Sequence, residues 1–237
     1  QKKSGTPTLG GVIIFVNFII GIWALYTFEL MFVFNSAIIW VLIATSLFFL
    51  IGFIDDVKSI RNKTNKGLSA KGKFILQIIV SIGLVVLLNY VVGSVTIIQG
   101  FLYVFLLTGT SNATNLTDGL DGLLSATMLV SLTGVMYSLI QMWRYEEVYI
   151  VIILMCSITI FLLFNWNPAK VFMGDSGSLM LGGFLASICI VIGKWWLLVG
   201  LGAMYVVETL SVIIQVISFK LRKKRIFLMT PLHHHFE

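Results

Sequence analysis

Long apolar runs are the feature that most constrains the fold of this 237-residue chain. An α-helix needs about 20 apolar residues to cross a bilayer. Hydrophobic residues make up 58% of the chain and charged residues 11%, which exceeds what a soluble core absorbs. The sequence therefore predicts an all-α polytopic membrane helix bundle, a single domain over residues 1–237. About eight spans are expected, at residues 11–29, 36–54, 73–93, 96–111, 121–141, 148–164, 177–193 and 195–219.

The basic residues predict the orientation of these spans. If the N-terminus is cytoplasmic and eight spans alternate, the cytoplasmic segments are 1–10, 55–72, 112–120, 165–176 and 220–237. With Lys73 at the edge of its segment, this face holds 14 of the 16 lysines and arginines, a strong positive-inside asymmetry. The net charge of +6 then reflects orientation and attraction for anionic lipids or phosphates, and it requires no nucleic-acid partner. All the aspartates fall on the same face.

The paired acids Asp55 and Asp56 stand where the second span is expected to leave the membrane. Adjacent carboxylates repel each other, so the pair requires a cation, a proton or a basic neighbour. Mg²⁺ binds one or two carboxylates together with substrate phosphates, which makes it the favoured cation. A solvated helix end is the simpler alternative, although carboxylates at a helix C-terminus oppose the macrodipole. A basic loop follows, in which lysines either face a diphosphate or serve only orientation.

The stretch TSNATNLTDGLDG carries polar residues at every third position, namely Asn112, Asn115, Asp118 and Asp121. We expect Thr117 or Asp118 to cap the next helix, with Asp118 and Asp121 on one face of its N-terminal end. Such an end offers free N–H groups to anions. Simple capping is the alternative, and it accounts for one aspartate but not for the whole ladder.

A third polar loop, NWNPAKVFMGDSG, presents Asp175 between two glycines at the start of a predicted helix. Phe172 in this loop either stacks on a base or is buried at the membrane interface. Glu208 lies inside the last predicted span, where a carboxylate is a functional candidate by default. A structural role, protonated or paired within a bent helix, explains it equally well and is our prediction.

The chain's three histidines stand in a row near its end, in PLHHHFE. Consecutive residues rarely all reach one ion, and no cysteine lies on the same predicted face, so a zinc site is disfavoured. Imidazoles near phosphate donate hydrogen bonds, stabilise charge or transfer protons. We therefore expect these residues to belong to an active site.

Together these motifs resemble the phospho-N-acetylmuramoyl-pentapeptide transferase family, within the superfamily that joins sugar 1-phosphates to polyprenyl phosphates. The resemblance runs through SGTPTLGG (4–11), FIDD (53–56), NKGLSAKGK (65–73), SNATNLTDGLDGL (111–123), NPAKVFMGDSGSL (167–179) and PLHHHFE (231–237). GTPTLGG and HHHFE favour the muramoyl-pentapeptide branch. The resemblance implies ten helices in a complete member, of which this chain is expected to lack the first and the last.

The resemblance also implies roles for individual residues. Asp55, Asp56, Asp175 and His233 would be catalytic, with Asp175 the principal Mg²⁺ contact, Asp56 near the metal and Asp55 the base. The substrate-binding residues would be Lys63, Lys71, Asn115, Asp118, Asp121, Asn165, Phe172, His234 and His235, with Phe172 against the uracil. Family members commonly carry a lysine three residues past the second aspartate, where this chain has Ser59 next to Lys58, so the resemblance assigns no role to Lys58.

The implied reaction is Mg²⁺-dependent transfer from UDP-N-acetylmuramoyl-pentapeptide to undecaprenyl phosphate, giving lipid I and UMP. The expected location is the bacterial plasma membrane, among membrane lipids, with the active site on the cytoplasmic face. The family suggests a homodimer, for which the sequence itself carries no sign. Direct attack is expected, and a covalent aspartyl-phosphate route competes with it. Alternatives are a UDP-N-acetylhexosamine-1-phosphate transferase for teichoic acid or surface polysaccharide, and a cation or proton transporter, which would carry its carboxylates near the bilayer midplane.

Overall fold

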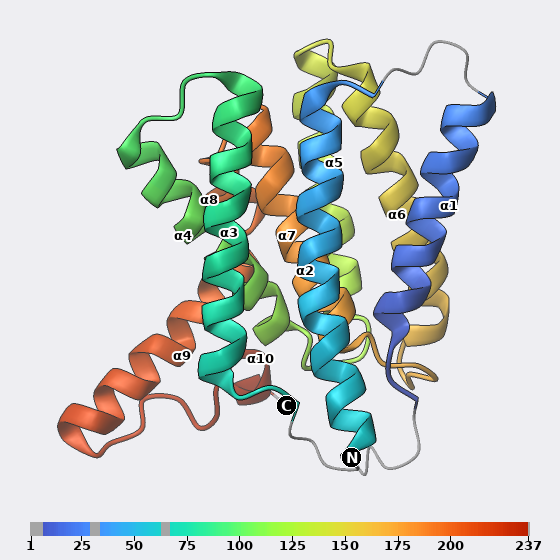
Figure 1. The fold of residues 1–237 in the computed structure, drawn as a ribbon. Coiled ribbons are helices and arrows are strands. Elements are labelled where there is room, and N and C mark those ends of the chain that lie inside the picture. Colours follow the sequence, from blue (N-terminus) through green and yellow to red (C-terminus); the bar gives the residue numbers. More distant parts are fainter. Residues whose placement is uncertain (1–6, 29–33, 63–66, 237) are drawn as a thin grey trace.

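The computed structural model describes residues 7–28, 34–62 and 67–236, and within these residues the only regular elements are helices (Figure 1). Successive long helices run in opposite directions, so that alternate connections gather at one end of the bundle. The elements are α1 (Gly10–Phe28), α2 (Ser36–Arg61), α3 (Ala70–Val92), α4 (Ile97–Thr117), α5 (Leu123–Gln141), α6 (Tyr145–Asn165), α7 (Gly174–Val191), α8 (Leu197–Leu201), α9 (Ala203–Arg222) and α10 (His233–Phe236).

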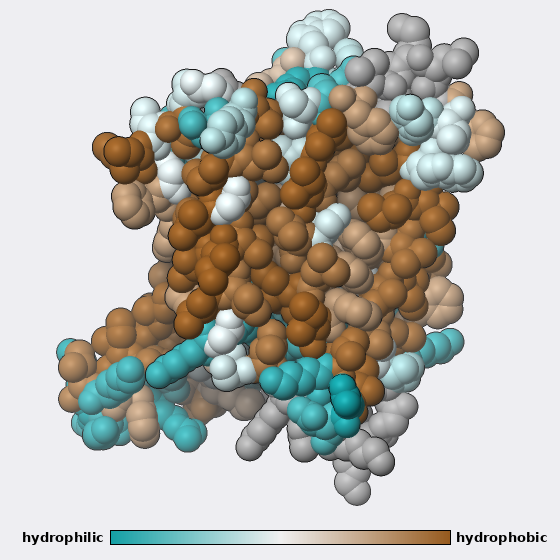
Figure 2. All heavy atoms as spheres, viewed as in Figure 1, coloured by the Kyte–Doolittle hydropathy of each residue, from teal (hydrophilic) through white to brown (hydrophobic). Residues whose placement is uncertain are grey.

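The surface has the distribution expected of a membrane protein. On the face drawn in Figure 2, hydrophobic side chains form a broad band across the middle of the molecule, and hydrophilic side chains gather at both ends. Among the described helices, seven are long and apolar enough to cross a bilayer: α1, α2, α3, α5, α6, α7 and α9. The predicted all-α polytopic bundle is confirmed.

Two of the eight predicted spans differ from the structure. The span expected at 96–111 is the longer helix α4, which is not among the seven because its last two turns are the polar sequence SNATNLT. The span expected at 195–219 is divided at Gly202 into the short helix α8 and the long helix α9. Helix α9 leaves the bundle at an angle, and the chain turns back from its tip to α10 (Figure 1).

Helix α7 is the centre of the bundle, with nearly every side chain from Ser176 to Ile190 buried. Its neighbours approach closely because glycines occupy the crossings. A Cβ atom on Gly52 of α2 would lie 2.1 Å from the carbonyl oxygen of Asp175, and one on Gly11 of α1 would lie 2.0 Å from the nitrogen of Gly177. On the side facing α4, a Cβ on Gly182 would meet Thr114 at 2.3 Å. Small residues at helix crossings let backbones approach closely in a membrane, where apolar burial alone does not hold helices together.

Buried polar side chains add hydrogen bonds between helices. Trp40 Nε1 donates to the Leu84 carbonyl at 2.7 Å, and Asn112 Nδ2 donates to Gln77 Oε1 at 2.7 Å. The hydroxyl of Thr114 donates to the carbonyl of Ser178 at 2.8 Å. Within a bilayer no water replaces such partners, so these bonds fix the relative positions of α2, α3, α4 and α7.

The α2–α7 crossing makes a prediction about stability. Gly52→Ala would force a methyl group against the Asp175 backbone, and overpacking of this kind costs typically about 1–3 kcal/mol. Gly83 of α3 is the matched control, because a Cβ there meets nothing within 4 Å. In thermal unfolding followed by size exclusion in detergent, Gly52→Ala should lower the midpoint while Gly83→Ala should leave it unchanged or raise it. Equal midpoints for the two variants would contradict the close α2–α7 contact.

Candidate active site

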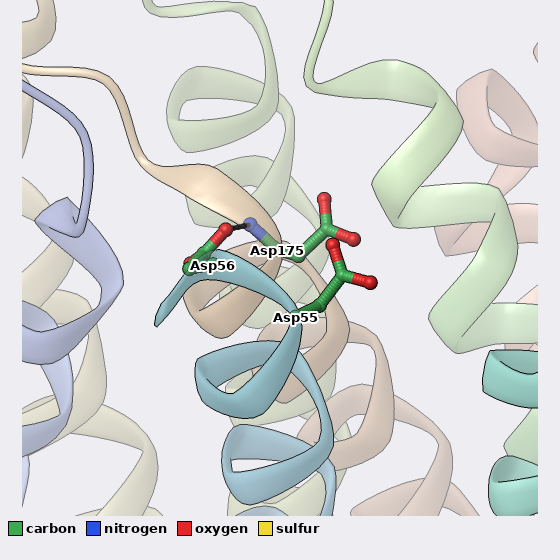
Figure 3. A group of neighbouring side chains, drawn as sticks. All are labelled: Asp55, Asp56 and Asp175. Atoms are coloured by element: carbon green, nitrogen blue, oxygen red, sulfur yellow. Dashed lines mark hydrogen bonds between the residues drawn. The ribbon is translucent and has the colours of Figure 1, made fainter. Parts of the chain in front are cut away.

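The adjacent aspartates Asp55 and Asp56 meet Asp175, which is distant in the sequence, at one end of the bundle. Asp55 and Asp56 come from α2, and Asp175 comes from the first turn of α7. One carboxylate oxygen from each lies within 4.8 Å of the others, and Figure 3 shows Asp55 and Asp175 close together. The expectation that the aspartates fall on one face is confirmed for these three residues. The helix does not end with the predicted span at 54: α2 continues to Arg61, and both of its aspartates are buried.

Asp56 caps the central helix. Its Oδ1 accepts the backbone N–H of Asp175 at 3.0 Å, and its Oδ2 accepts that of Ser176 at 2.9 Å. Gly174 adopts φ +77°, and a Cβ on it would lie 2.7 Å from Oδ2 of Asp56. A carboxylate at a helix N-terminus satisfies free N–H groups and complements the macrodipole. These hydrogen bonds therefore fix the Asp56 side chain and also fix the position of α2 relative to the N-terminus of α7.

Asp55 and Asp175 share a basic partner, Lys73, from the first turn of α3. The ammonium of Lys73 forms an ion pair with Asp175 Oδ2, and it lies 3.7 Å from Asp55 Oδ1. The backbone N–H of Leu68 also donates to Asp55 Oδ1, at 2.8 Å. A positive charge between two carboxylates offsets their repulsion in the low dielectric near the membrane.

Asn115 joins this cluster from the last turns of α4. Its Nδ2 donates to Asp175 Oδ1 at 2.8 Å and to Ser178 Oγ at 2.9 Å. The predicted polar ladder is thus divided between two local structures. Asn112 and Asn115 lie in α4, whereas Asp121 lies in the turn before α5.

The expected cap of the following helix was wrong. Asp118 is the C-cap of α4, and α5 begins only at Leu123, with Gly122 at its N-cap in a left-handed conformation (φ +75°). Asp121 Oδ2 instead accepts the N–H of Ala169 at 3.0 Å, which connects the α4–α5 turn to the α6–α7 loop. Asp118 and Asp121 therefore do not share a face of α5.

Asn165 also connects the α4–α5 turn to the α6–α7 loop. It is buried, its Oδ1 accepts the N–H of Gly122 at 3.0 Å, and its Nδ2 donates to the carbonyl of Val171 at 2.9 Å. Phe172 is half-buried, and its backbone bonds Pro7 and Gly10 of the N-terminal segment. Contact of Asn165 and Phe172 with a nucleotide remains a prediction.

The histidine segment packs against the α4–α5 turn. His233 is buried, and a Cβ on Gly119 would lie 2.1 Å from its Nε2. The ring centroids of His233 and His234 are 4.3 Å apart. His235 Nδ1 accepts the N–H of Leu228 at 3.1 Å. The histidine segment therefore lies at the polar end of the bundle, as expected.

The basic loop is placed only in part. Lys63 lies outside the described residues. Lys71 is exposed, whereas Lys73 reaches the aspartates. Sequence reasoning named Lys71 and left Lys73 as an edge residue, although the helix start signalled by Ser69 as N-cap could have shown that the two lysines point in different directions.

Comparison with known proteins places these residues in a family. Residues 38–193 match the glycosyl transferase family 4. Proteins called phospho-N-acetylmuramoyl-pentapeptide-transferase from Halalkalibacterium halodurans, Bacillus cytotoxicus and Bacillus mycoides are similar over 100% of this chain and 76% of their own length. The identities are 42%, 41% and 41% respectively. The chain belongs to the phospho-N-acetylmuramoyl-pentapeptide transferase family. The predicted family and the prediction of a transferase are confirmed.

In this transferase the polar end combines negative and positive groups suited to a charged substrate. Carboxylates of Asp55 and Asp175, the ammonium of Lys73 and the amide of Asn115 form one connected network. The histidine segment lies on the α4–α5 turn beside it. Such preorganised groups stabilise charge that develops during group transfer, because they need little reorganisation when the reaction occurs.

The capping role of Asp56 predicts a loss of stability in this transferase. Asp56→Ala removes the acceptor of two backbone N–H groups, and it should cost about 1–3 kcal/mol because the helix end is left unsatisfied. Asp56→Asn retains one acceptor oxygen and should cost less. Asp121→Ala is the control, since it also removes a carboxylate that accepts a backbone N–H, but in a more exposed turn. A thermal midpoint for Asp56→Ala equal to that of the native chain would rule out the cap.

Proposed function

We propose that this transferase moves phospho-N-acetylmuramoyl-pentapeptide from its UDP-linked donor to undecaprenyl phosphate, giving lipid I and UMP. The observation that carries this proposal is the network of Asp55, Asp175, Lys73 and Asn115 at the polar end of an apolar bundle. A membrane-embedded acceptor and a water-soluble donor meet at such a boundary. The name that the relatives carry and the positive-inside asymmetry support a multi-pass protein of the bacterial plasma membrane, with this end in the cytoplasm.

The reaction exchanges one phosphoanhydride for another. An oxygen of the lipid phosphate forms a bond to the β-phosphorus of the donor, the bond from that phosphorus to the bridging oxygen breaks, and UMP leaves. Any proton on the attacking phosphate passes to Asp55. Asp55 suits this role better than Asp56, since both oxygens of Asp56 already accept backbone N–H groups. Positioning and charge neutralisation dominate catalysis of phosphoryl transfer.

The aspartates fit a Mg²⁺ ion. Their oxygens are hard ligands, and those of Asp55, Asp56 and Asp175 lie close enough to bind one ion. Asp175 would be the principal ligand. Coordination by Asp56 would use a lone pair that its backbone hydrogen bonds leave available. When bound, Mg²⁺ would offset charge on the donor's diphosphate.

Basic and aromatic groups complete the proposed substrate site. Lys73 lies where it would face the phosphates, and His233 with its neighbours His234 and His235 would bind from the histidine segment. On the nucleotide side, the proposed contacts remain Asn115, Asp118, Asp121, Asn165 and Phe172. Lys71 remains a proposed contact of the substrate phosphates.

The lipid tail of the acceptor has a candidate location as well. An apolar cavity of about 330 Å³ lies between α4 and α9, lined by residues that include Phe105, Ala113, Tyr205, Val206 and Leu210. It lies beside the helix that carries Asn115. An isoprenoid chain entering sideways from the bilayer would match the chemistry of this lining.

The first experiment measures UMP release by the full-length protein in lipid, with Mg²⁺ and undecaprenyl phosphate. UDP-N-acetylmuramoyl-pentapeptide should release UMP, UDP-N-acetylglucosamine should not, and chelation of Mg²⁺ should abolish release. Asp175→Asn and His233→Ala should each lower the rate by roughly two orders of magnitude or more, as loss of a group that stabilises transferring charge does.

Other outcomes would redirect the proposal. Release from UDP-N-acetylglucosamine instead would assign the protein to the polysaccharide branch of the superfamily. A folded protein that releases UMP from neither donor would refute the transferase reaction and favour the transport alternative.

The structure points to Lys73 as the lysine nearest the aspartates, whereas the family resemblance named Lys71. Lys73→Met removes the charge between Asp55 and Asp175, so it should lower kcat by roughly a hundredfold, within the range for loss of one charge-stabilising group. Lys71→Met is the matched control, two residues away on the same helix but exposed, and its loss should be much smaller. If Lys71→Met were the more damaging variant in the UMP assay, the placement of Lys73 at the reacting groups would be wrong.

A further inference from the structure

Glu208 is a carboxylate in an unusual place. It lies in α9, a helix whose apolar side chains are largely exposed on the outside of the bundle, yet its own side chain is 0% exposed. Burying an acidic group inside a membrane segment is costly unless partners compensate it. The identity of those partners therefore indicates what the residue does.

The partners of Glu208 belong to the histidine segment. Its two carboxylate oxygens lie 3.2 and 3.3 Å from the backbone nitrogen of His233, and Oε1 also lies 3.2 Å from Nδ1 of the His233 ring. The N–H of His233 is the first of α10, so the carboxylate satisfies a backbone group that the short helix itself leaves without an intrahelical acceptor. One side chain of α9 thus accepts the backbone N–H of His233 and also lies beside its ring.

A second residue of α9 holds the same returning chain. Gln215 Oε1 accepts the N–H groups of Ile226 and Phe227 at 2.9 and 3.0 Å, and its Nε2 donates to the Phe227 carbonyl at 2.9 Å. Glu208 and Gln215 are seven residues apart, so they lie two turns apart on one face of α9. The chain that turns back from the tip of α9 in Figure 1 is therefore hydrogen-bonded to that helix at two positions, Gln215 and Glu208.

The ring of His233 is held between Glu208 and the α4–α5 turn. Nδ1 faces Glu208, and Nε2 lies so close to Gly119 that a Cβ there would be 2.1 Å away. A carboxylate this close to Nδ1 favours the forms of the imidazole that carry a proton there, and so favours this orientation of the ring. Here Nε2 points to the turn that carries Asp118 and Asp121.

We propose that Glu208 is a positioning residue for His233. Its carboxylate seats the histidine segment and fixes the His233 ring with Nε2 presented at the α4–α5 turn. Glu208 touches neither donor nor acceptor, and it acts on the reaction only through His233. The catalytic part of this inference rests on the proposed function, whereas the seating of the segment does not.

Glu208→Gln is the decisive variant, because it keeps the size of the side chain and one oxygen that can accept the His233 N–H. Its amide NH₂ would face Nδ1 and favour the tautomer with the proton on Nε2. We expect kcat to fall by roughly 10–100-fold, the usual effect of losing a residue that orients a functional histidine. The KM for the donor should change much less. Glu146→Gln removes a carboxylate at the opposite end of the bundle and should leave kcat unchanged.

A double-mutant cycle separates positioning from a general loss of stability. Once His233→Ala has been made, adding Glu208→Gln should lower kcat no further, because residues that act as a unit are non-additive. Multiplicative losses, or a native kcat in Glu208→Gln alone, would refute the catalytic part of the inference.

Hydrogen exchange tests the seating of the segment without any assay of activity. In Glu208→Ala, the peptide covering 231–236 should exchange faster than in the native chain, while peptides of α7 should keep their protection. Unchanged exchange at 231–236 would overturn the inference even if the protein released no UMP. Absence of UMP release from the native chain, with faster exchange in Glu208→Ala, would instead refute the proposed function and retain the seating role.

Discussion

The close contact between α2 and α7 is the interaction on which the polar end of the molecule depends. Gly52 lets the α2 backbone reach the carbonyl of Asp175, and Asp56 then binds the N-terminus of α7. Because these contacts fix both helices along their axes, they also fix Asp55 relative to Asp175. A larger residue at the crossing would separate the two carboxylates as well as the two helices.

The membrane explains why this end is so fully bonded. Backbone and side-chain polar groups near the bilayer have few water molecules to replace a lost partner, so each requires one within the protein. Asp56 satisfies the end of α7, Asn165 satisfies Gly122 and Val171, and Glu208 satisfies the start of α10. Asp55 and Asp175 differ from these residues, since they share the charged side chain of Lys73, although Asp55 also accepts the backbone N–H of Leu68. Three neighbouring aspartates thus acquire different tasks from different surroundings.

Much of this arrangement could be predicted from the sequence. Apolar run lengths and the distribution of lysine and arginine indicated the helices, their alternation and the gathering of the aspartates, because these properties follow from local composition. The choice between Lys71 and Lys73 could not be made in this way. Two residues apart on a helix means roughly 200° around its axis, so only the packing of α3 against α2 and α4 decides which lysine faces Asp175.

The start of α5 and the partner of Glu208 could not be predicted for a related reason. Asp118 has the residue type of an N-cap, but the chain continues α4 to Thr117 and reverses through the left-handed Gly122, which local propensity does not reveal. For Glu208 the sequence predicted a structural role, protonated or paired, but its partner His233 lies 25 residues further along, beyond the tip of α9. Pairings of this kind depend on tertiary structure and leave no periodic signal.

Helix α9 brings together two surfaces that the sequence showed separately. Tyr205, Val206 and Leu210 line the apolar cavity against α4, while Glu208 and Gln215 hold the histidine segment. Both sets stand on one continuous helix that begins at the break at Gly202. A rotation of α9 about this break would therefore move the lining of the cavity and the ring of His233 together. The geometry available to an acceptor lipid and the geometry of the histidines are consequently not independent in this fold.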